Sequence, residues 1–217
     1  MLVKDRMTPQ PLVAVTPDTP IVEAQRSMQE HSIRHIPVVT EHHNLVGLLT
    51  RETVLKAIPW SATSLSALET QYVLSKITAG KVMIRDVITV SEDVAVEEAA
   101  RIMVDHKIGC LPVLRAGALV GMITDIDLLS TTMEMLGARQ PGLRLSVTLP
   151  NRVGEMARLS AAIAAIGGYI SALGSWQVKQ NLERWGVVLK VNRVSKEQLM
   201  DTVEKIPEIE ILDVREN

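Results

Sequence analysis

A stretch near the start of the sequence recurs in its middle. Residues 15–39 align with residues 90–114 at an offset of 75, with 10 identities in 25 positions. One residue is lost in the following turn, after which Leu45–Thr50 aligns with Leu119–Thr124 at an offset of 74. Self-similarity at a fixed offset is the signature of a repeated structural unit. The chain therefore contains two tandem copies of one unit, each about 55 residues long.

Both copies predict the same order of elements. A short strand and a turn precede a helix, whose apolar positions in the first copy are Ile21, Ala24 and Met28. Two further strands lead to Thr50 or Thr124, and a threonine hydroxyl at this place accepts the free N–H groups of a helix's first turn. Each unit is thus βαββα. The strands are expected at residues 12–15, 36–39 and 45–49, and again at 87–90, 111–114 and 119–123.

The last part of the chain predicts a third unit with a different order. A polar turn at 151–154 separates a strand from a helix that stops at Gly167-Gly168. Gln180-Asn181 joins two strands as a hairpin, and the capping box Ser195–Gln198 opens a second helix. The strands are expected at residues 144–149, 169–179, 182–192 and 209–214. The resulting order βαββαβ is that of ferredoxin-like folds.

The repeated unit resembles a known module. Gly47–Thr50 and Gly121–Asp127 resemble the end of a CBS motif, and Arg34–Val39 resembles the central strand of that family. Two such motifs in tandem resemble a CBS pair, or Bateman module, over residues 1–135. Motif 1 is expected at residues 1–58, a linker with a short helix opened by Ser66–Glu69 at 59–80, and motif 2 at 81–138.

The third unit, residues 143–217, resembles an ACT domain because Asn151–Gly154 lies between its first strand and helix. The family usually has Asp where Asn151 stands. The order CBS–CBS–ACT resembles the AcuB family of acetoin-utilisation accessory proteins. These resemblances imply an α/β (α+β) fold class. They imply two βαββα CBS repeats with pseudo-two-fold symmetry, followed by a C-terminal ferredoxin-like βαββαβ ACT domain.

Thr124 and Asp127 are the candidate nucleotide-binding residues. A helix N-terminus presents free N–H groups to a phosphate, the Thr124 hydroxyl adds a donor, and Asp127 can accept from both ribose hydroxyls. The CBS resemblance implies an adenosine nucleotide at this spacing. The alternative is an N-cap and a first-turn acid without a ligand. The base slot is expected from Val87, Ile88, Thr89, Ile108, Cys110 and Pro112.

The first copy departs from this pattern, because Thr53 stands where the second copy has Asp127. A hydroxyl cannot accept from two ribose hydroxyls as a carboxylate can. The corresponding half-site is therefore predicted to be empty, weak or selective for another ligand. Its residues are Thr50, Ile33, His35 and Pro37.

The ACT resemblance implies that a loop binds an amino acid at the interface between two ACT domains. The alternative is a tight turn in which Asn151 caps the helix that begins at Glu155. In that case Gly154 only allows a close approach of the chain. The loop residues are Asn151, Arg152, Val153 and Gly154.

Composition excludes several function classes. The 23 basic and 25 acidic residues give a net charge of −2, which does not favour nucleic acid or an anionic membrane as a partner. A lone cysteine, Cys110, excludes a disulfide framework and fits a reducing cytoplasm. The uncharged stretch 159–178 is broken by Gly167-Gly168, which favours a helix and a buried strand over a membrane span. His31 and His35 are not expected to bind a metal, because their segment is extended and no cysteine or carboxylate joins them.

The sequence also contains no Gly-x-Ser-x-Gly, no Walker A loop and no Gly-x-Gly-x-x-Gly. We therefore predict a cytoplasmic, non-enzymatic sensor without a cofactor. Its regulatory ligand is an adenosine nucleotide (AMP, ADP or ATP-like, or an S-adenosyl compound), and its occupancy acts on a regulated protein. The alternative is an interaction or scaffold protein with vestigial sites. A homodimer is expected, because exposed sheet edges and the apolar strand segments 169–173 and 187–189 favour pairing.

Overall fold

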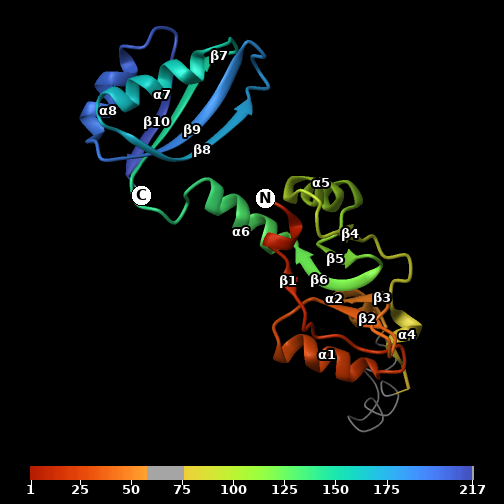
Figure 1. The fold of residues 1–217 in the computed structure, drawn as a ribbon. Coiled ribbons are helices and arrows are strands. Elements are labelled where there is room, and N and C mark those ends of the chain that lie inside the picture. Colours follow the sequence, from red (N-terminus) through yellow and green to blue (C-terminus); the bar gives the residue numbers. More distant parts are fainter. Residues whose placement is uncertain (58–75, 217) are drawn as a thin grey trace. The chain divides into compact units, whose positions relative to one another are not determined.

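The computed structural model describes residues 1–57 and 76–216. They form two compact units, Met1–Leu128 and Leu129–Asn217 (Figure 1). The helix predicted at Ser66–Glu69 lies outside the described residues. Within the described ranges, no helix is both long and apolar enough to cross a bilayer.

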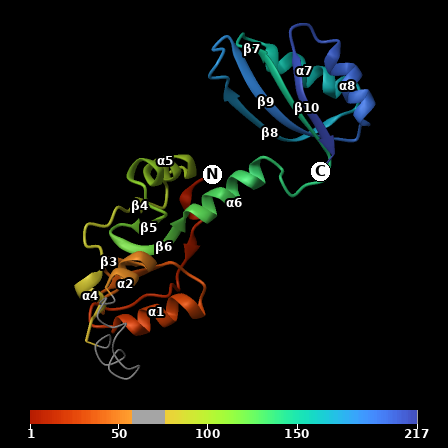
Figure 2. The ribbon, with the colours of Figure 1, turned by 180° about the vertical axis from the view of Figure 1, so that it is seen from behind.

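The first unit contains the two repeats, each built on an antiparallel hairpin with helices beside it (Figures 1 and 2). Strands β2 (His35–Val39) and β3 (Leu45–Thr50) form the hairpin of the first repeat. The second repeat has a four-stranded sheet in the order β1 (Thr8–Pro9), β6 (Ala118–Thr124), β5 (Cys110–Arg115) and β4 (Val90–Ser91). The helices are η1 (Val3–Asp5), α1 (Ile21–Glu30), α2 (Arg51–Lys56), α4 (Ala79–Val82), α5 (Val96–His106) and α6 (Asp125–Met135).

The repeat predicted from the sequence is present, but the first strand of each copy is shorter than predicted. The strand expected at 12–15 is only an isolated bridge at Val15, and the one expected at 87–90 is β4, Val90–Ser91. In each hairpin the register shifts directly after the same position, Val38 in the first repeat and Val113 in the second. A short parallel contact precedes each helix, from Val15 to Val38 and from Val90 to Val113. The two repeats therefore share their hydrogen-bonding pattern as well as their sequence.

The repeats exchange short segments, which the sequence comparison did not predict. The Val3 N–H donates to the Val94 carbonyl at 2.8 Å, so residues near the N-terminus lie on the second repeat. At the equivalent place in the second copy, the Ala79 N–H donates to the Thr19 carbonyl at 2.8 Å. The segment that contains Ala79 therefore lies on the first repeat. Val3 and Ala79 are both fully buried, each in the core of the opposite repeat.

The exchanged segments explain why both repeats have glycine in their last strand. A side chain at Gly47 would collide with Met83, which arrives with the exchanged segment. A side chain at Gly121 would collide with Met7 in the same way. Only a residue without Cβ lets the methionines pack so closely over β3 and β6.

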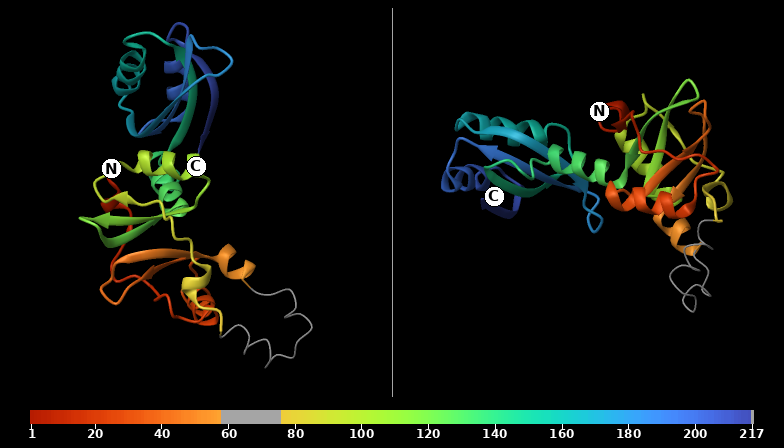
Figure 3. Two further views of the ribbon diagram at one scale, coloured as in Figure 1. Left: turned by 90° about the vertical axis from the view of Figure 1, so that its right-hand side faces the viewer. Right: turned by 90° about the horizontal axis from the view of Figure 1, so that it is seen from below.

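The second unit has the order predicted for residues 143–217. Its elements are β7 (Leu143–Pro150), α7 (Glu155–Ala165), β8 (Tyr169–Gln177), β9 (Arg184–Asn192), α8 (Lys196–Glu204) and β10 (Glu210–Glu216). The antiparallel sheet has the strand order β10-β7-β9-β8. Both helices cover one face of this sheet (Figure 3). The core between them contains the fully buried side chains of Leu145, Leu159, Ile163, Leu189 and Leu199.

Two details of this unit bear on the predictions. The predicted capping box is confirmed, because the Ser195 hydroxyl accepts from the Gln198 N–H at 3.2 Å and the Gln198 side chain accepts from the Ser195 N–H at 3.0 Å. A buried strand was predicted after Gly167-Gly168; the strand is present, but it is not buried. β8 is an edge strand that pairs only with β9, so most of its residues keep contact with solvent.

Candidate functional site

Two cavities lie between the repeats of the first unit, and the pseudo-symmetry relates them. We call them the Asp127 cleft, of about 360 Å³, and the Arg51 cleft, of about 540 Å³. In each, the start of a capped helix from one repeat faces strands of the other repeat. Both volumes fall within the range of small-molecule sites, which is roughly 300–1,000 Å³.

The Asp127 cleft has its polar groups at the start of α6. The Thr124 backbone N–H and hydroxyl both donate to Asp127 Oδ2, at 2.8 and 2.7 Å. The Asp127 side chain thus accepts from the residue before the helix, which is one half of a capping box. A carboxylate offers two oxygens and about four acceptor positions, so this contact and a ribose contact are compatible. The apolar lining comes from Pro11, Leu12, Val13, Ile33, Pro37 and Met122.

The structure groups the predicted site residues differently from the sequence analysis. Thr124 and Asp127 share their cleft with Ile33, His35 and Pro37, which the sequence analysis assigned to the first-copy half-site. The residues expected around them line the Arg51 cleft instead, together with Thr50; these are Val87, Ile88, Ile108 and Cys110. Thr89 and Pro112 are not among the residues lining either cleft. The cause is the packing of the repeats, which turns each capped helix toward the strands of the other repeat.

In the Arg51 cleft, the equivalent helix is capped by two threonines. The Thr53 hydroxyl accepts from the Thr50 N–H at 3.0 Å and donates to the Thr50 carbonyl at 2.9 Å. The Thr53 hydroxyl is therefore a neutral group, and its proton already forms a hydrogen bond with the Thr50 carbonyl. The charged side chains around this cleft are Arg34, Arg51, Glu52, Lys56, Asp86, Lys107 and Asp125.

Arg34 and His35 line both clefts and form a shared wall. Burial, and then the Arg34 charge, lower the pKa of His35, while Asp125 acts in the opposite direction. Burial raises the pKa of the neighbouring Cys110 thiol to about 12, and Asp127 and Asp125 add to this effect. Cys110 is only 2% exposed and stays protonated, which fits the small core residue predicted for a strand.

Sequence reasoning missed several lining residues, although a signal for some was present. Leu12 and Val13 align with Val87 and Ile88 at the repeat offset. Because Val87 and Ile88 were expected to line one cleft, the symmetry indicates that Leu12 and Val13 line the other, the Asp127 cleft. The basic residues Arg51 and Lys107 carried no such signal, because they have no basic counterpart in the other copy. Among residues 1–57 and 76–216, no three His, Cys, Asp or Glu side chains gather as a metal site would require.

In the second unit, the predicted loop makes contacts within its own chain. The Asn151 side chain accepts from Trp185 Nε1 at 2.6 Å and donates to the Leu182 carbonyl at 3.3 Å. The expectation that Asn151 caps the following helix is therefore wrong. The N-cap of α7 is Gly154, whose φ of 91° lies in the left-handed region that favours glycine. Val153 is exposed.

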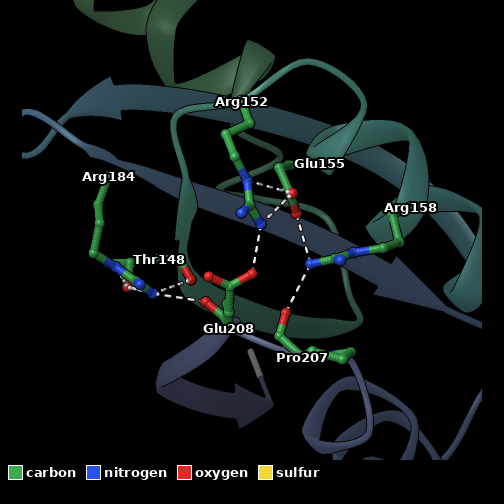
Figure 4. A network of polar contacts seen from close by, with 7 residues as sticks. All are labelled: Thr148, Arg152, Glu155, Arg158, Arg184, Pro207 and Glu208. Carbon is green, nitrogen blue, oxygen red and sulfur yellow. Dashed lines mark hydrogen bonds and ion pairs between the residues drawn. The ribbon is translucent and has the colours of Figure 1, made fainter.

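Arg152 belongs to a network that holds the start of α7 against the chain before β10 (Figure 4). It contacts Glu155 at 2.9 Å and Glu208 at 2.5 Å. Arg158 contacts the other Glu155 oxygen at 2.6 Å and donates to the Pro207 carbonyl at 2.7 Å. The Glu155 side chain is 8% exposed, so two guanidinium groups compensate a buried carboxylate. A cavity of about 260 Å³ lies beside this network, lined by Asn151, Arg152, Glu155, Met156 and Trp185 among others.

Comparison with known families agrees with the repeat. Residues 3–59 and 79–134, more than half of the chain, match the CBS domain family. The chain belongs to the CBS domain family. A CBS domain-containing protein of Dictyostelium discoideum is 31% identical over 139 residues, which cover 63% of this chain and 94% of that protein. An inosine-5′-monophosphate dehydrogenase of Korarchaeum cryptofilum is 32% identical over 137 residues, which cover 63% of this chain but only 25% of the enzyme.

Solved structures show the same tandem CBS pair. The crystal structure described as an acetoin utilization protein (AcuB) of Vibrio cholerae has a TM-score of 0.52 and 30% identity, covering 64% of this chain and 96% of its own. CBSX2 of Arabidopsis thaliana in complex with AMP has a TM-score of 0.51 and 27% identity, and the match covers 61% of this chain and 96% of CBSX2. The CBS pair of protein MJ0100 is solved in complex with 5′-methylthioadenosine and S-adenosyl-L-methionine. It has a TM-score of 0.51 and 30% identity, and the match covers 62% of this chain and 97% of that one.

Proposed function

We propose that this chain is a regulatory sensor whose CBS pair binds an adenosine compound. The observation that carries the proposal is the Asp127 cleft, where a hydroxyl–carboxylate pair from the second repeat faces an apolar wall from the first. A site with apolar walls and a few convergent polar groups suits a nucleoside, which has a flat base and two ribose hydroxyls. That CBSX2 is solved with AMP and the MJ0100 pair with adenosyl compounds supports the ligand class.

In this proposal Asp127 accepts from the ribose hydroxyls. The base lies between Val13 and Ile33 on one side and Met122 on the other. The lining comes from both repeats, so a bound ligand contacts both of them at once. Binding then favours the arrangement of the repeats that closes on the ligand, and this population shift is what a regulated protein would detect.

The proposal includes no catalytic activity. The dehydrogenase relative is matched over only 25% of its length, in the part that corresponds to the CBS pair. We assign residues 143–217 to an ACT domain, an assignment supported by the order βαββαβ and by the position of the 151–154 loop. An amino acid at that loop would meet Asn151 and Arg152 already paired within the chain, so we place the regulatory ligand in the CBS pair.

Thermal unfolding of the full chain with adenosine, AMP, ATP and S-adenosylmethionine tests the proposal. A ligand at 100 times its dissociation constant adds about 2.7 kcal/mol to the free energy of unfolding. We expect at least one adenosine compound to raise the midpoint, and Asp127→Asn to reduce the rise at the same ligand concentration. Asp105→Asn, on the exposed side of α5, is the matched control. No shift with any of the four compounds would favour the alternative, a scaffold protein with vestigial sites.

A further inference from the structure

A further cavity lies within the first repeat, and we call it the α1 cavity. It has a volume of about 570 Å³, which is large enough for a small molecule, and it shares only Pro11 and Leu12 with the Asp127 cleft. Its titratable side chains are Glu23, Glu41 and His43. The rest of the lining is apolar groups, hydroxyls and one amide, namely Pro11, Leu12, Ala14, Val15, Val39, Thr16, Thr19, Ser27, Thr40 and Gln10.

The second repeat has larger side chains at equivalent positions. Ser27 aligns with Ile102, which packs against the core of the second repeat. Thr40 aligns with Arg115, whose Nη2 donates to Glu92 Oε2 at 2.6 Å. Small hydroxyl residues in the first repeat thus stand where the second repeat has a bulky apolar group and an ion pair. The open space of the α1 cavity is therefore a property of the first repeat and not of the shared fold.

The carboxylate of Glu23 also differs from its counterpart. Glu23 and Arg26 align with Glu98 and Arg101 at the same spacing. In the second repeat, Arg101 contacts Glu98 at 2.6 Å. In the first repeat, the Glu23 side chain lines the cavity and forms no ion pair with any other described residue, and the same is true of Glu41. Two uncompensated carboxylates therefore border one cavity.

These features indicate the chemistry of a ligand. The two carboxylates come from different elements, Glu23 from α1 and Glu41 from the turn between β2 and β3. None of the described lysines or arginines lines the cavity, so the complementary ligand is a cation. The apolar side chains of Leu12, Val15 and Val39 favour methylene groups over a hydrated metal ion. Two ammonium groups joined by methylene groups satisfy both features.

We propose that the α1 cavity binds an aliphatic polyamine. One ammonium group lies at Glu23 and another at Glu41, while the methylene groups between them contact Leu12 and Val39. Each ammonium group has three donors, and the hydroxyls of the lining accept those that the carboxylates leave over. The site is independent of the proposed adenosine site, because Asp127 does not line the α1 cavity.

Calorimetric titration of the full chain with diaminobutane, butylamine and Mg²⁺ tests the proposal. We expect diaminobutane to bind more tightly than butylamine, which has the same carbon chain but only one ammonium group. Glu23 and Glu41 are exposed, so Glu23→Gln and Glu41→Gln should each weaken diaminobutane binding by about fivefold. Glu98→Gln, the same change at the equivalent position of the second repeat, is the matched control and should leave the affinity unchanged.

A second variant tests the cavity itself. Ser27→Ile introduces the side chain that the second repeat has at this position, so it should fill the cavity and abolish diaminobutane binding. Circular dichroism verifies that the variant is folded, and the two glutamine variants decide the question if it is not.

Three results would overturn the proposal. They are no binding of diaminobutane to the wild type, an affinity that neither Glu23→Gln nor Glu41→Gln changes, and equal affinities for diaminobutane and butylamine. Displacement of diaminobutane by an equal concentration of Mg²⁺ would also overturn it, because the acidic surface would then attract any cation. Adenosine binding, measured in the same variants, reports on the proposed function separately, so either proposal can fail while the other stands.

Discussion

The Arg34 guanidinium donates to Asp125 Oδ1 at 2.8 Å, and this contact joins the two repeats of the CBS pair. Arg34 precedes β2 in the first repeat, and Asp125 opens α6 in the second. The Arg34 side chain lines both clefts, while Asp125 lines only the Arg51 cleft. Any molecule in either cleft would therefore lie beside the Arg34 side chain, which gives the two clefts a physical route for coupling.

We expect Arg34→Gln to change the coupling between the clefts more than the stability of the fold. The ion pair is about half exposed on both sides, so its loss costs about 0–1 kcal/mol of unfolding free energy. Inorganic tripolyphosphate serves as an anionic probe of the Arg51 cleft, which has four basic side chains in its lining. Its affinity, measured with and without saturating adenosine, should differ in the wild type and differ less in the variant. Lys4→Gln breaks another exposed ion pair that lines neither cleft and serves as control. Equal coupling in Arg34→Gln and the wild type would contradict this prediction.

The Asp127→Ala variant should lose adenosine affinity by ten- to a hundredfold, because a charged acceptor contributes about 1.5–3 kcal/mol to such a contact. The same change also removes the acceptor for the Thr124 N–H and hydroxyl. We therefore expect up to about 1 kcal/mol less unfolding free energy, in the range for a side-chain contact that closes the start of a helix. Calorimetry and urea unfolding measure the two effects separately. A folded variant with wild-type affinity would exclude Asp127 from the site.

Local patterns predicted the elements well because they depend on neighbouring residues. The spacing of Ile21, Ala24 and Met28 specified α1, and the hydroxyl of Thr50 specified the start of α2. The site was predicted less well, since its lining depends on how the repeats pack. Nothing in the sequence around Asp127 indicates that Ile33, from the other repeat, lies across the cleft.

The segment exchange escaped prediction for a similar reason. Val3 and Ala79 occupy equivalent places, yet they differ in side chain and lie outside the stretch of repeated identities. The edge position of β8 depends on sheet order, which strand patterns alone do not determine. Contacts between residues far apart in the chain therefore account for most of what the sequence analysis missed.

Glu155→Gln should destabilise the second unit. The carboxylate is buried between Arg152 and Arg158, and removing its charge leaves two guanidinium groups less well paired. We expect a loss of about 1–3 kcal/mol in unfolding free energy, in the range for charged hydrogen bonds. Glu208→Gln removes the exposed carboxylate that also contacts Arg152 and should cost less. Urea unfolding followed by tryptophan fluorescence compares the variants, and an equal cost would show that burial is not the cause.

The lowered pKa of His35 predicts a loss of stability in mild acid. Its folded-state pKa lies below the unfolded value of about 6.5, so the folded state binds the proton less well. The stabilisation is complete above about pH 6.5 and declines as the pH falls through the unfolded and then the folded pKa. We expect the drop in unfolding free energy between pH 7.5 and 5.5 to be smaller in His35→Gln. His31→Gln, at an exposed histidine, is the control, and a drop equal to wild type in His35→Gln would contradict the assignment.

The second unit should form a homodimer through the edge strand β8. This strand pairs only with β9 and exposes Tyr169, Leu173 and Trp176, which are 54%, 42% and 42% accessible. The opposite edge strand, β10, is rich in charged residues, and charge at an edge opposes pairing. Light scattering of the full chain should give twice 23.8 kDa at micromolar concentration, and Leu173→Lys should reduce it to the monomer. Leu212→Lys on β10, at a similarly exposed leucine, should remain dimeric. A wild-type monomer, or dissociation by Leu212→Lys alone, would rule out this interface, because neither result is possible if β8 holds the copies together.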